Sequence, residues 1–176
     1  MKIQQFLPFI SVAFLMSACF RETSQVKSLE TVSNVDLPHF AGTWHEIARY
    51  PNRFQKGCLD TFATCSPMEN GKVTVVSHYR TDSGEKTAHG TAKVVDPQTN
   101  ARLKVTFFRP FYGDYWIIDL GKDYEYAVVG TPNRKYLWIL SRTPVLDLQL
   151  YNGILEKIKL QGFDPAKLLR TEHPKG

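Results

Sequence analysis

The chain has 176 residues, a formal net charge of +5 and a pI of about 9.1, and 43% of its residues are hydrophobic, which suffices for one globular domain with a substantial core. Its 22 Lys and Arg residues are scattered among 17 acidic residues. This mixing excludes the clustered basic footprint of a nucleic-acid-binding protein.

The chain begins with an export signal, MKIQQFLPFISVAFLMSA, over residues 1–18. Its apolar run from Phe6 to Met16 is too short to span a bilayer. The run ends in LMSAC, which resembles the lipobox of bacterial lipoproteins, so Cys19 is expected to be acylated. Phe20 stands where an Asp would retain such a protein elsewhere, and this implies anchoring in the outer membrane, on its periplasmic face. Ordinary secretory cleavage is the alternative.

The segment after the signal, residues 19–35, is polar and lacks sustained periodicity. It therefore predicts a flexible tether between the anchor and a folded domain over residues 36–176. A coil of that length reaches about 20 to 25 Å. The domain can then lie near a membrane surface without being embedded in it.

Between residues 42 and 142, polar and apolar side chains alternate with a period of two, and turn residues separate the short runs. All connections but the first are short enough for hairpins, which predicts an all-β antiparallel meander. Closure into an eight-stranded up-and-down barrel would remove the two exposed edges, although a two-sheet sandwich fits the same strand count. The expected strands are 43–50, 61–66, 72–80, 85–95, 101–108, 114–120, 124–130 and 135–142.

The pattern changes after Arg142, where apolar residues recur at helical spacing through residues 145–160. The apolar face of this helix must pack on something, and the outside wall of the barrel is available. Asp164 and Pro165 predict the cap and first turn of a short helix. The following LLRTE, residues 168–172, can add a last short strand.

Three motifs, GTW at 42–44, GDY at 113–115 and Arg142 at the end of LWILSR, occur in the order found in the lipocalin family. With GTWHEIARYPNRFQKG, PFYGDY and YLWILSRTP, the chain resembles in particular the bacterial outer-membrane and apolipoprotein D branches of that family, over residues 36 to about 172. The resemblance implies a calyx with a C-terminal α-helix outside it, in which Trp44 crosses the closed end and Arg142 stacks on the indole. The residues with a structural role would be Gly42, Trp44, Asp114, Tyr115 and Arg142.

The resemblance also implies a cup that binds a hydrophobic ligand without catalysis or a cofactor. Outer-membrane lipocalins bind fatty acids and lysophospholipids, so the same ligands are expected here, in lipid storage or transport. An interior packed solid with side chains is the alternative. His89 stands where relatives commonly carry an acid; unless simply solvated, it is expected to contact an anionic head group, with affinity weakening as pH rises. The residues expected to line the cup are Ala63, Cys65, Ala88, His89, Leu103, Val105, Phe107, Tyr112 and Trp138.

Other interpretations of the cysteines and histidines remain open. Cys65 could serve a thiol-dependent isomerase of a hydrophobic substrate, although no base partner is visible. A disulfide between Cys58 and Cys65 suits an oxidising compartment, but an extended strand would hold the two too far apart. His78 and His89 are equidistant from the Ser83–Gly84 turn and would face each other, which supplies only half a zinc shell, so no metal is expected. The aromatic segment FFRPFYGDY at the open end suits either a homodimer or membrane contact.

Overall fold

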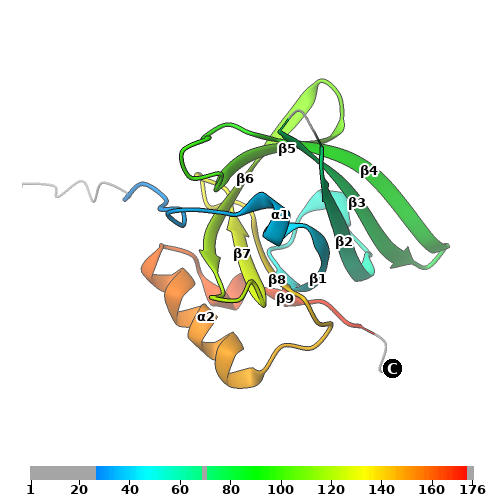
Figure 1. Ribbon diagram of the computed structural model, residues 1–176. Coiled ribbons are helices and arrows are strands. Elements are labelled where there is room, and N and C mark those ends of the chain that lie inside the picture. The colour runs from blue at the N-terminus through cyan, green and yellow to red at the C-terminus, as the bar shows by residue number, and fades with distance from the viewer. Residues whose placement is uncertain (1–26, 69–70, 174–176) are drawn as a thin grey trace, which may run out of the picture.

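The computed structural model describes residues 27–68 and 71–173 and shows a closed antiparallel barrel with one long helix on its outside (Figure 1). A single helical turn, α1 (Leu37–Phe40), leads into the barrel. Asp36 caps this turn, because its carboxylate accepts a hydrogen bond from the backbone N–H of His39 at 3.2 Å. The strands are β1 (Gly42–Arg49), β2 (Leu59–Pro67), β3 (Lys72–Thr81), β4 (Gly84–Val94), β5 (Arg102–Phe108), β6 (Phe111–Leu120), β7 (Tyr126–Gly130), β8 (Leu137–Ser141) and β9 (Leu169–Arg170).

Strands β1 to β8 follow one another around the barrel in chain order, and β1 closes it by pairing with both β8 and β2. The pairing of β1 with β2 covers Gly42 to His45, and the short β9 lies beside the rest of β1, at Ala48 and Arg49. The up-and-down barrel of eight antiparallel strands is thus confirmed, and the sandwich is excluded.

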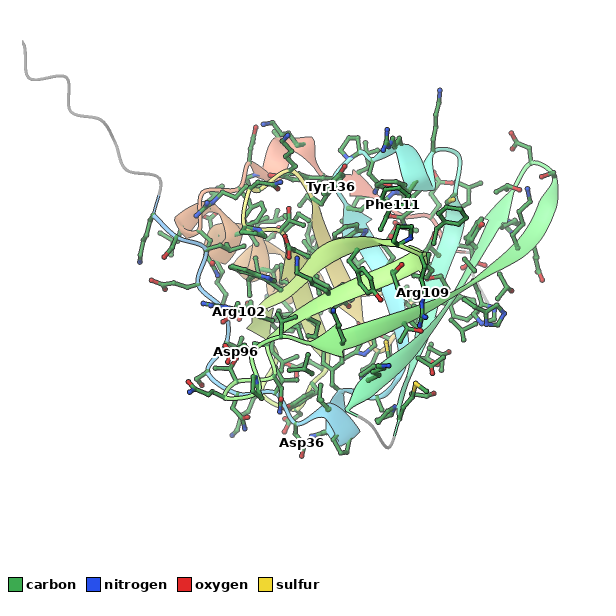
Figure 2. The ribbon with its side chains drawn as sticks, turned by 90° about the horizontal axis from the view of Figure 1, so that it is seen from above. Asp36, Asp96, Arg102, Arg109, Phe111 and Tyr136 are labelled. Atoms are coloured by element: carbon green, nitrogen blue, oxygen red, sulfur yellow. The ribbon has the colours of Figure 1, made fainter. Side chains whose placement is uncertain are left out.

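The two ends of the barrel differ in which connections they carry. The β1–β2, β3–β4, β5–β6 and β7–β8 connections lie together at one end, called the open end below, because each strand reverses the direction of the last. The β2–β3, β4–β5 and β6–β7 connections, the segment between β8 and the C-terminal helix, and α1 lie at the closed end. Figure 2 shows Phe111 and Tyr136 at the open end and Asp36 at the closed end.

The predicted strands match the structure to within three residues at every end, and the largest difference is the start of β6. The predicted pairing of His78 with His89 is wrong. The β3–β4 turn is Asp82–Ser83, so His78 lies opposite Thr87, and His89 lies opposite Val76. No group of three or more potential metal-ligating side chains occurs within residues 27–68 and 71–173.

The helix α2 (Leu148–Leu160) covers the outside of the barrel, as the sequence predicts (Figure 1). The carboxylate of Asp147 caps it by accepting from the backbone N–H of Leu150 at 2.9 Å. Its buried face packs against outward-facing side chains of β1, β6, β7 and β8. The one-turn helices η1 (Arg53–Gln55) and η2 (Pro165–Lys167) complete the fold, and η2 has the expected Asp164 cap. Within the described part of the chain, no helix is long and apolar enough to cross a membrane.

The segment before α1 is part of the folded domain. Leu29 and Val35 are buried, and the backbone N–H groups of Val32 and Val35 donate to Ile117 O at 3.1 Å and Thr99 O at 2.7 Å. The tether predicted over residues 19–35 is therefore too long, because the apolar residues at every third position of its second half dock on the barrel. Residues 19–26 and the predicted signal lie outside the described residues.

Candidate ligand-binding site

The closed end of the barrel is sealed by Trp44 and Arg142. The indole of Trp44 is 1% exposed, and the guanidinium carbon of Arg142 lies 3.7 Å from its ring centroid. Trp44 Nε1 also donates to Phe40 O at 2.9 Å, which ties α1 to the floor. Arg142 donates to backbone oxygens of His39 at 2.8 Å and Thr43 at 3.0 Å. The stacked pair implied by the resemblance is present, and both side chains donate hydrogen bonds to backbone oxygens.

Gly42 begins β1 in a conformation that other residues rarely adopt, with φ of +98°. A Cβ atom at this position would also lie 3.4 Å from Arg142 Nη1. The glycine of the GTW motif therefore turns the chain from α1 into the barrel beside the guanidinium.

The inner wall changes character along the barrel axis. Toward the closed end, Leu103, Ile117 and Ala127 are buried in one apolar cluster with Trp44. Toward the open end, inward positions such as Val105 remain partly exposed although they belong to the same wall. The interior is thus filled below and accessible above, which is the geometry of a cup.

Most of the residues predicted to line this cup lie on its inner wall. Trp138 and Val105 pack against the inner cluster and are partly exposed. Ala63 lies opposite Trp44, and Ala88 alternates with the inward Gly90 and Ala92, so both point inward. The Phe107 ring occupies the space that a Cβ of Gly90 would need.

Two predicted residues lie deeper than expected. Leu103 and Cys65 face inward but are buried at the closed end, 4% and 7% exposed. Burial raises the pKa of the Cys65 thiol to about 11, with the Arg142 charge opposing the shift. The thiol is therefore protonated near neutral pH, which argues against a nucleophilic role. Cys58 and Cys65 are both free thiols, at opposite ends of β2.

His89 and Tyr112 were expected in the cup, and the structure places both on the outer face. His89 is exposed and follows the inward Ala88, so strand alternation turns it outward. Tyr112 shares its face with Asp114, and Lys93 Nζ lies 4.8 Å from its ring centroid. An anionic head group inside the cup cannot reach either ring.

The motif residues of β6 also separate by face. Asp114 points outward and forms a 3.0 Å ion pair with Lys104. Tyr115 points inward into the apolar cluster, and burial raises the pKa of its hydroxyl. Asp114 and Tyr115 therefore stabilise the barrel, and neither lines the accessible part of the cup.

A buried polar network stands on the inner wall toward the open end. Glu46 and Arg49 form an ion pair whose side chains are 3% and 9% exposed. Gln55 links to it, donating to Glu46 Oε2 at 2.6 Å and accepting from Trp138 Nε1 at 2.9 Å. Thr171 Oγ1 donates to Glu46 Oε1 at 2.6 Å. The network fastens the β1–β2 loop and the C-terminal segment to the cup.

The sequence patterns did not predict this network. A signal existed for Glu46, which follows Trp44 by two residues and so faces the same way. None existed for Arg49, because a bulge between Glu46 and Ala48 shifts the register of β1 and turns Arg49 inward. Thr61 was also missed; its Oγ1 is buried on the inward side of β2 and has no hydrogen-bond partner among the described residues.

Two pockets open near this end of the barrel. One, of about 440 Å³, lies under the β1–β2 loop, and one, of about 310 Å³, lies beside the β5–β6 turn. The larger is lined by Arg49, Pro51, Asn52, Arg53, Gln55, Lys56, Gly57 and Leu169. The smaller is lined by Thr74, His89, Gly90, Thr91, Thr106, Phe107, Phe108 and Arg109.

A closed barrel with a sealed floor, an accessible upper interior and an outer helix defines a calyx-type binding protein. The comparisons with known proteins agree. A lipocalin-like domain matches residues 35–173. The chain is 36% identical over 176 residues to the outer membrane lipoprotein Blc of Escherichia coli strain K12, covering 99% of both chains. It is 35% identical over 157 residues to temperature-induced lipocalin-1 of Arabidopsis thaliana, covering 84% of both.

Among solved structures, insecticyanin from the tobacco hornworm Manduca sexta has the same fold, with a TM-score of 0.70 at 21% identity over 84% of this chain and 85% of that one. The chain therefore belongs to the lipocalin family. Members of this family are generally non-enzymatic binding proteins, and as a lipocalin this chain binds small hydrophobic ligands.

Proposed function

We propose that this lipocalin binds single-chain amphiphilic lipids, fatty acids or lysophospholipids, in its cup and stores or transports them as an outer-membrane lipoprotein acylated at Cys19. The observation that carries the proposal is the gradient of the inner wall, which is closed and apolar at the Trp44 floor and partly exposed at Val105 and Trp138. Such a shape accommodates an acyl chain pointing inward and a head group near the mouth.

Polar groups near the mouth support an amphiphile over a purely apolar ligand. The buried Thr61 hydroxyl faces the cup. Arg53 and Lys56 line the pocket under the β1–β2 loop, so cationic groups stand where an anionic head group would emerge. The membrane location is supported by the relatives named outer membrane lipoprotein, which match over nearly the whole chain including the segment around Cys19.

Native mass spectrometry of the mature protein purified from cell envelopes tests the proposal. A copurified lipid of one acyl chain is the expected result, and protein that copurifies with none and takes up neither fatty acid nor lysophospholipid would contradict it. Ala88→Phe fills the cup from the inner wall and should lower the bound fraction. Thr87→Phe places the same ring on the outer face of the same strand and should leave binding unchanged.

A further inference from the structure

The open end carries large apolar side chains in contact with water. Phe54 is 70% exposed, and Phe108 and Phe111 are 75% and 71% exposed, with their rings stacked 6.4 Å apart. They belong to the β1–β2 loop and the β5–β6 turn, which lie at the same end of the barrel. Figure 2 shows Phe111 and Tyr136 toward this end. Exposed phenyl rings gathered around an opening indicate an interaction surface.

Charge separates the two ends of the barrel. The four open-end connections, residues 50–58, 82–83, 109–110 and 131–136, carry five basic residues and one acidic residue. The described residues of the closed-end connections carry four acidic residues and two basic ones. The open-end set is Arg53, Lys56, Arg109, Arg134 and Lys135 against Asp82; the closed-end set is Asp96, Asp123, Glu125 and Asp147 against Lys122 and Arg142. An anionic surface therefore attracts the open end and repels the other.

The chain toward the anchor also leaves the domain near the open end. Lys27 accepts a hydrogen bond through its backbone oxygen from Arg134 Nη2, and Arg134 belongs to the β7–β8 connection. From Lys27 the chain runs to the closed end, where Asp36 N–H donates to Tyr124 Oη at 2.9 Å. Seven residues lie between Cys19 and Lys27, and the eight steps along the chain span at most about 29 Å when fully extended. An anchor at Cys19 therefore keeps the open end within reach of the bilayer, whereas the closed end lies about 25 Å further along the strands.

From these three observations we propose that the cup faces the membrane that holds the anchor, and that a rim of Phe54, Phe108 and Phe111 with Arg53, Lys56 and Arg109 rests on an anionic lipid surface. The phenyl rings enter the interface, and the cations meet phosphate groups. A lipid can then pass between bilayer and cup without crossing bulk water. The inference rests on the proposed acyl anchor, but it concerns orientation and has tests that do not measure ligand binding.

Orientation is measured on the acylated mature chain in vesicles of phosphatidylethanolamine and phosphatidylglycerol. A fluorescent donor is placed through Lys135→Cys at the open end or Gln98→Cys at the closed end, with acceptors on the lipid head groups. Both native residues are exposed, whereas Cys58 and Cys65 are buried. Energy transfer from position 135 is expected to exceed that from position 98 about twofold or more, since the ends of an eight-residue strand lie about 25 Å apart. Equal transfer, or the reverse order, overturns the proposal.

The contribution of the rim is measured without the anchor, by co-flotation of the mature chain carrying Cys19→Ser with the same vesicles. The triple variant Phe54→Ser, Phe108→Ser and Phe111→Ser should reduce vesicle binding about tenfold, because interfacial affinity follows the buried apolar area. The matched control, Val145→Ser with Leu148→Ser, removes apolar side chains that are 78% and 67% exposed near the closed end and should change nothing. Replacing phosphatidylglycerol by phosphatidylcholine should also weaken binding.

A second copy of this chain is the competing occupant of the rim. If the triple variant abolishes self-association in sedimentation experiments but leaves vesicle binding unchanged, the rim is a contact between copies and the proposal fails. A lipid captured by a protein that shows no preferred orientation leaves the proposed function standing and removes only this inference. A protein that is oriented as proposed but binds no lipid in its cup supports this inference and contradicts the proposed function.

Discussion

The closed and open ends of this barrel are built from the same eight strands and differ in almost every physical respect. At the closed end, Arg142 stacks on Trp44 and donates to three backbone oxygens, and the surrounding apolar side chains are buried. At the open end, phenyl rings and cations meet solvent, and Gln55 and its polar partners hold a loop over the mouth. The difference shows that one end is closed by buried contacts, whereas the other presents the exposed groups through which we propose that the protein meets its ligand and the membrane.

Trp44→Ala should cause the largest loss of stability, because it disrupts the closed end. Removing a buried indole leaves a cavity under Arg142, and we expect the free energy of unfolding to fall by about 3 to 5 kcal/mol. Urea unfolding followed by circular dichroism measures the loss. Trp138→Ala, a truncation of the partly exposed tryptophan at the open end, should cost clearly less. Equal losses would show that the two ends do not differ in this way.

Glu46→Ala tests the strongly buried ion pair between Glu46 and Arg49 on the inner wall. The variant leaves the Arg49 guanidinium buried without its carboxylate, which should cost about 3 kcal/mol. Glu156→Ala removes an exposed carboxylate paired with Lys159 on α2 and should cost well under 1 kcal/mol. Thermal melts of both variants beside the parent chain provide the check. A loss for Glu46→Ala as small as that for Glu156→Ala would mean that the network does not hold the loop.

Gly42→Ala sharpens the description of the closed end. The positive φ of Gly42 and the nearby Arg142 Nη1 both oppose a methyl group, and we expect a loss of about 2 kcal/mol. Gly153→Ala is the matched control, because Gly153 lies on the exposed face of α2 with open space where the Cβ would stand. That substitution should gain about 0.5 to 1 kcal/mol from helix propensity. Chemical denaturation of the two variants should therefore give shifts of opposite sign.

The buried Cys65 thiol predicts the smallest effect. Its folded-state pKa of about 11 lies above the ordinary value of 9.0, so the contribution of the protonated thiol is fully present below pH 9 and is lost as pH rises toward 11. Between pH 8 and 10 this should cost about 1 kcal/mol of unfolding free energy. The parent chain is compared with Cys65→Ala over that range, since other groups titrate in both. If the free energy of unfolding depends on pH identically in the two proteins, the Cys65 thiol is exposed to water and the prediction is wrong.

The barrel itself was predictable from the sequence because its determinants are local. Alternation marks each strand, turn residues mark each hairpin, and Trp44 and Arg142 stand in motifs with a known spatial relation. The parity of a single strand likewise predicts the inward position of Trp138. Each of these features can be predicted from a single segment of the chain, without knowing how that segment pairs with another.

What the sequence did not predict depends on register between segments. A turn two residues long, Asp82–Ser83, decides that His78 does not face His89, and the bulge in β1 decides that Arg49 enters the cup. The inward position expected of His89 and Tyr112 failed for a different reason. It rested on the resemblance alone, whereas alternation within each strand turns His89 and Tyr112 outward beside Ala88 and Gly113. The docking of residues 27–35 has three apolar residues as its only local signal.

The position of Arg142 late in the chain determines when the floor of the barrel can be completed. Its bonds to Thr43 and His39 bridge 99 and 103 residues of chain, so the indole it covers is synthesised long before its cover exists. A nascent chain that stops short of Arg142 lacks the guanidinium that covers Trp44, so its barrel floor is incomplete. Contacts of such long range carry a loop-closure cost and slow folding, so the floor of the barrel cannot be completed until Arg142 is in place.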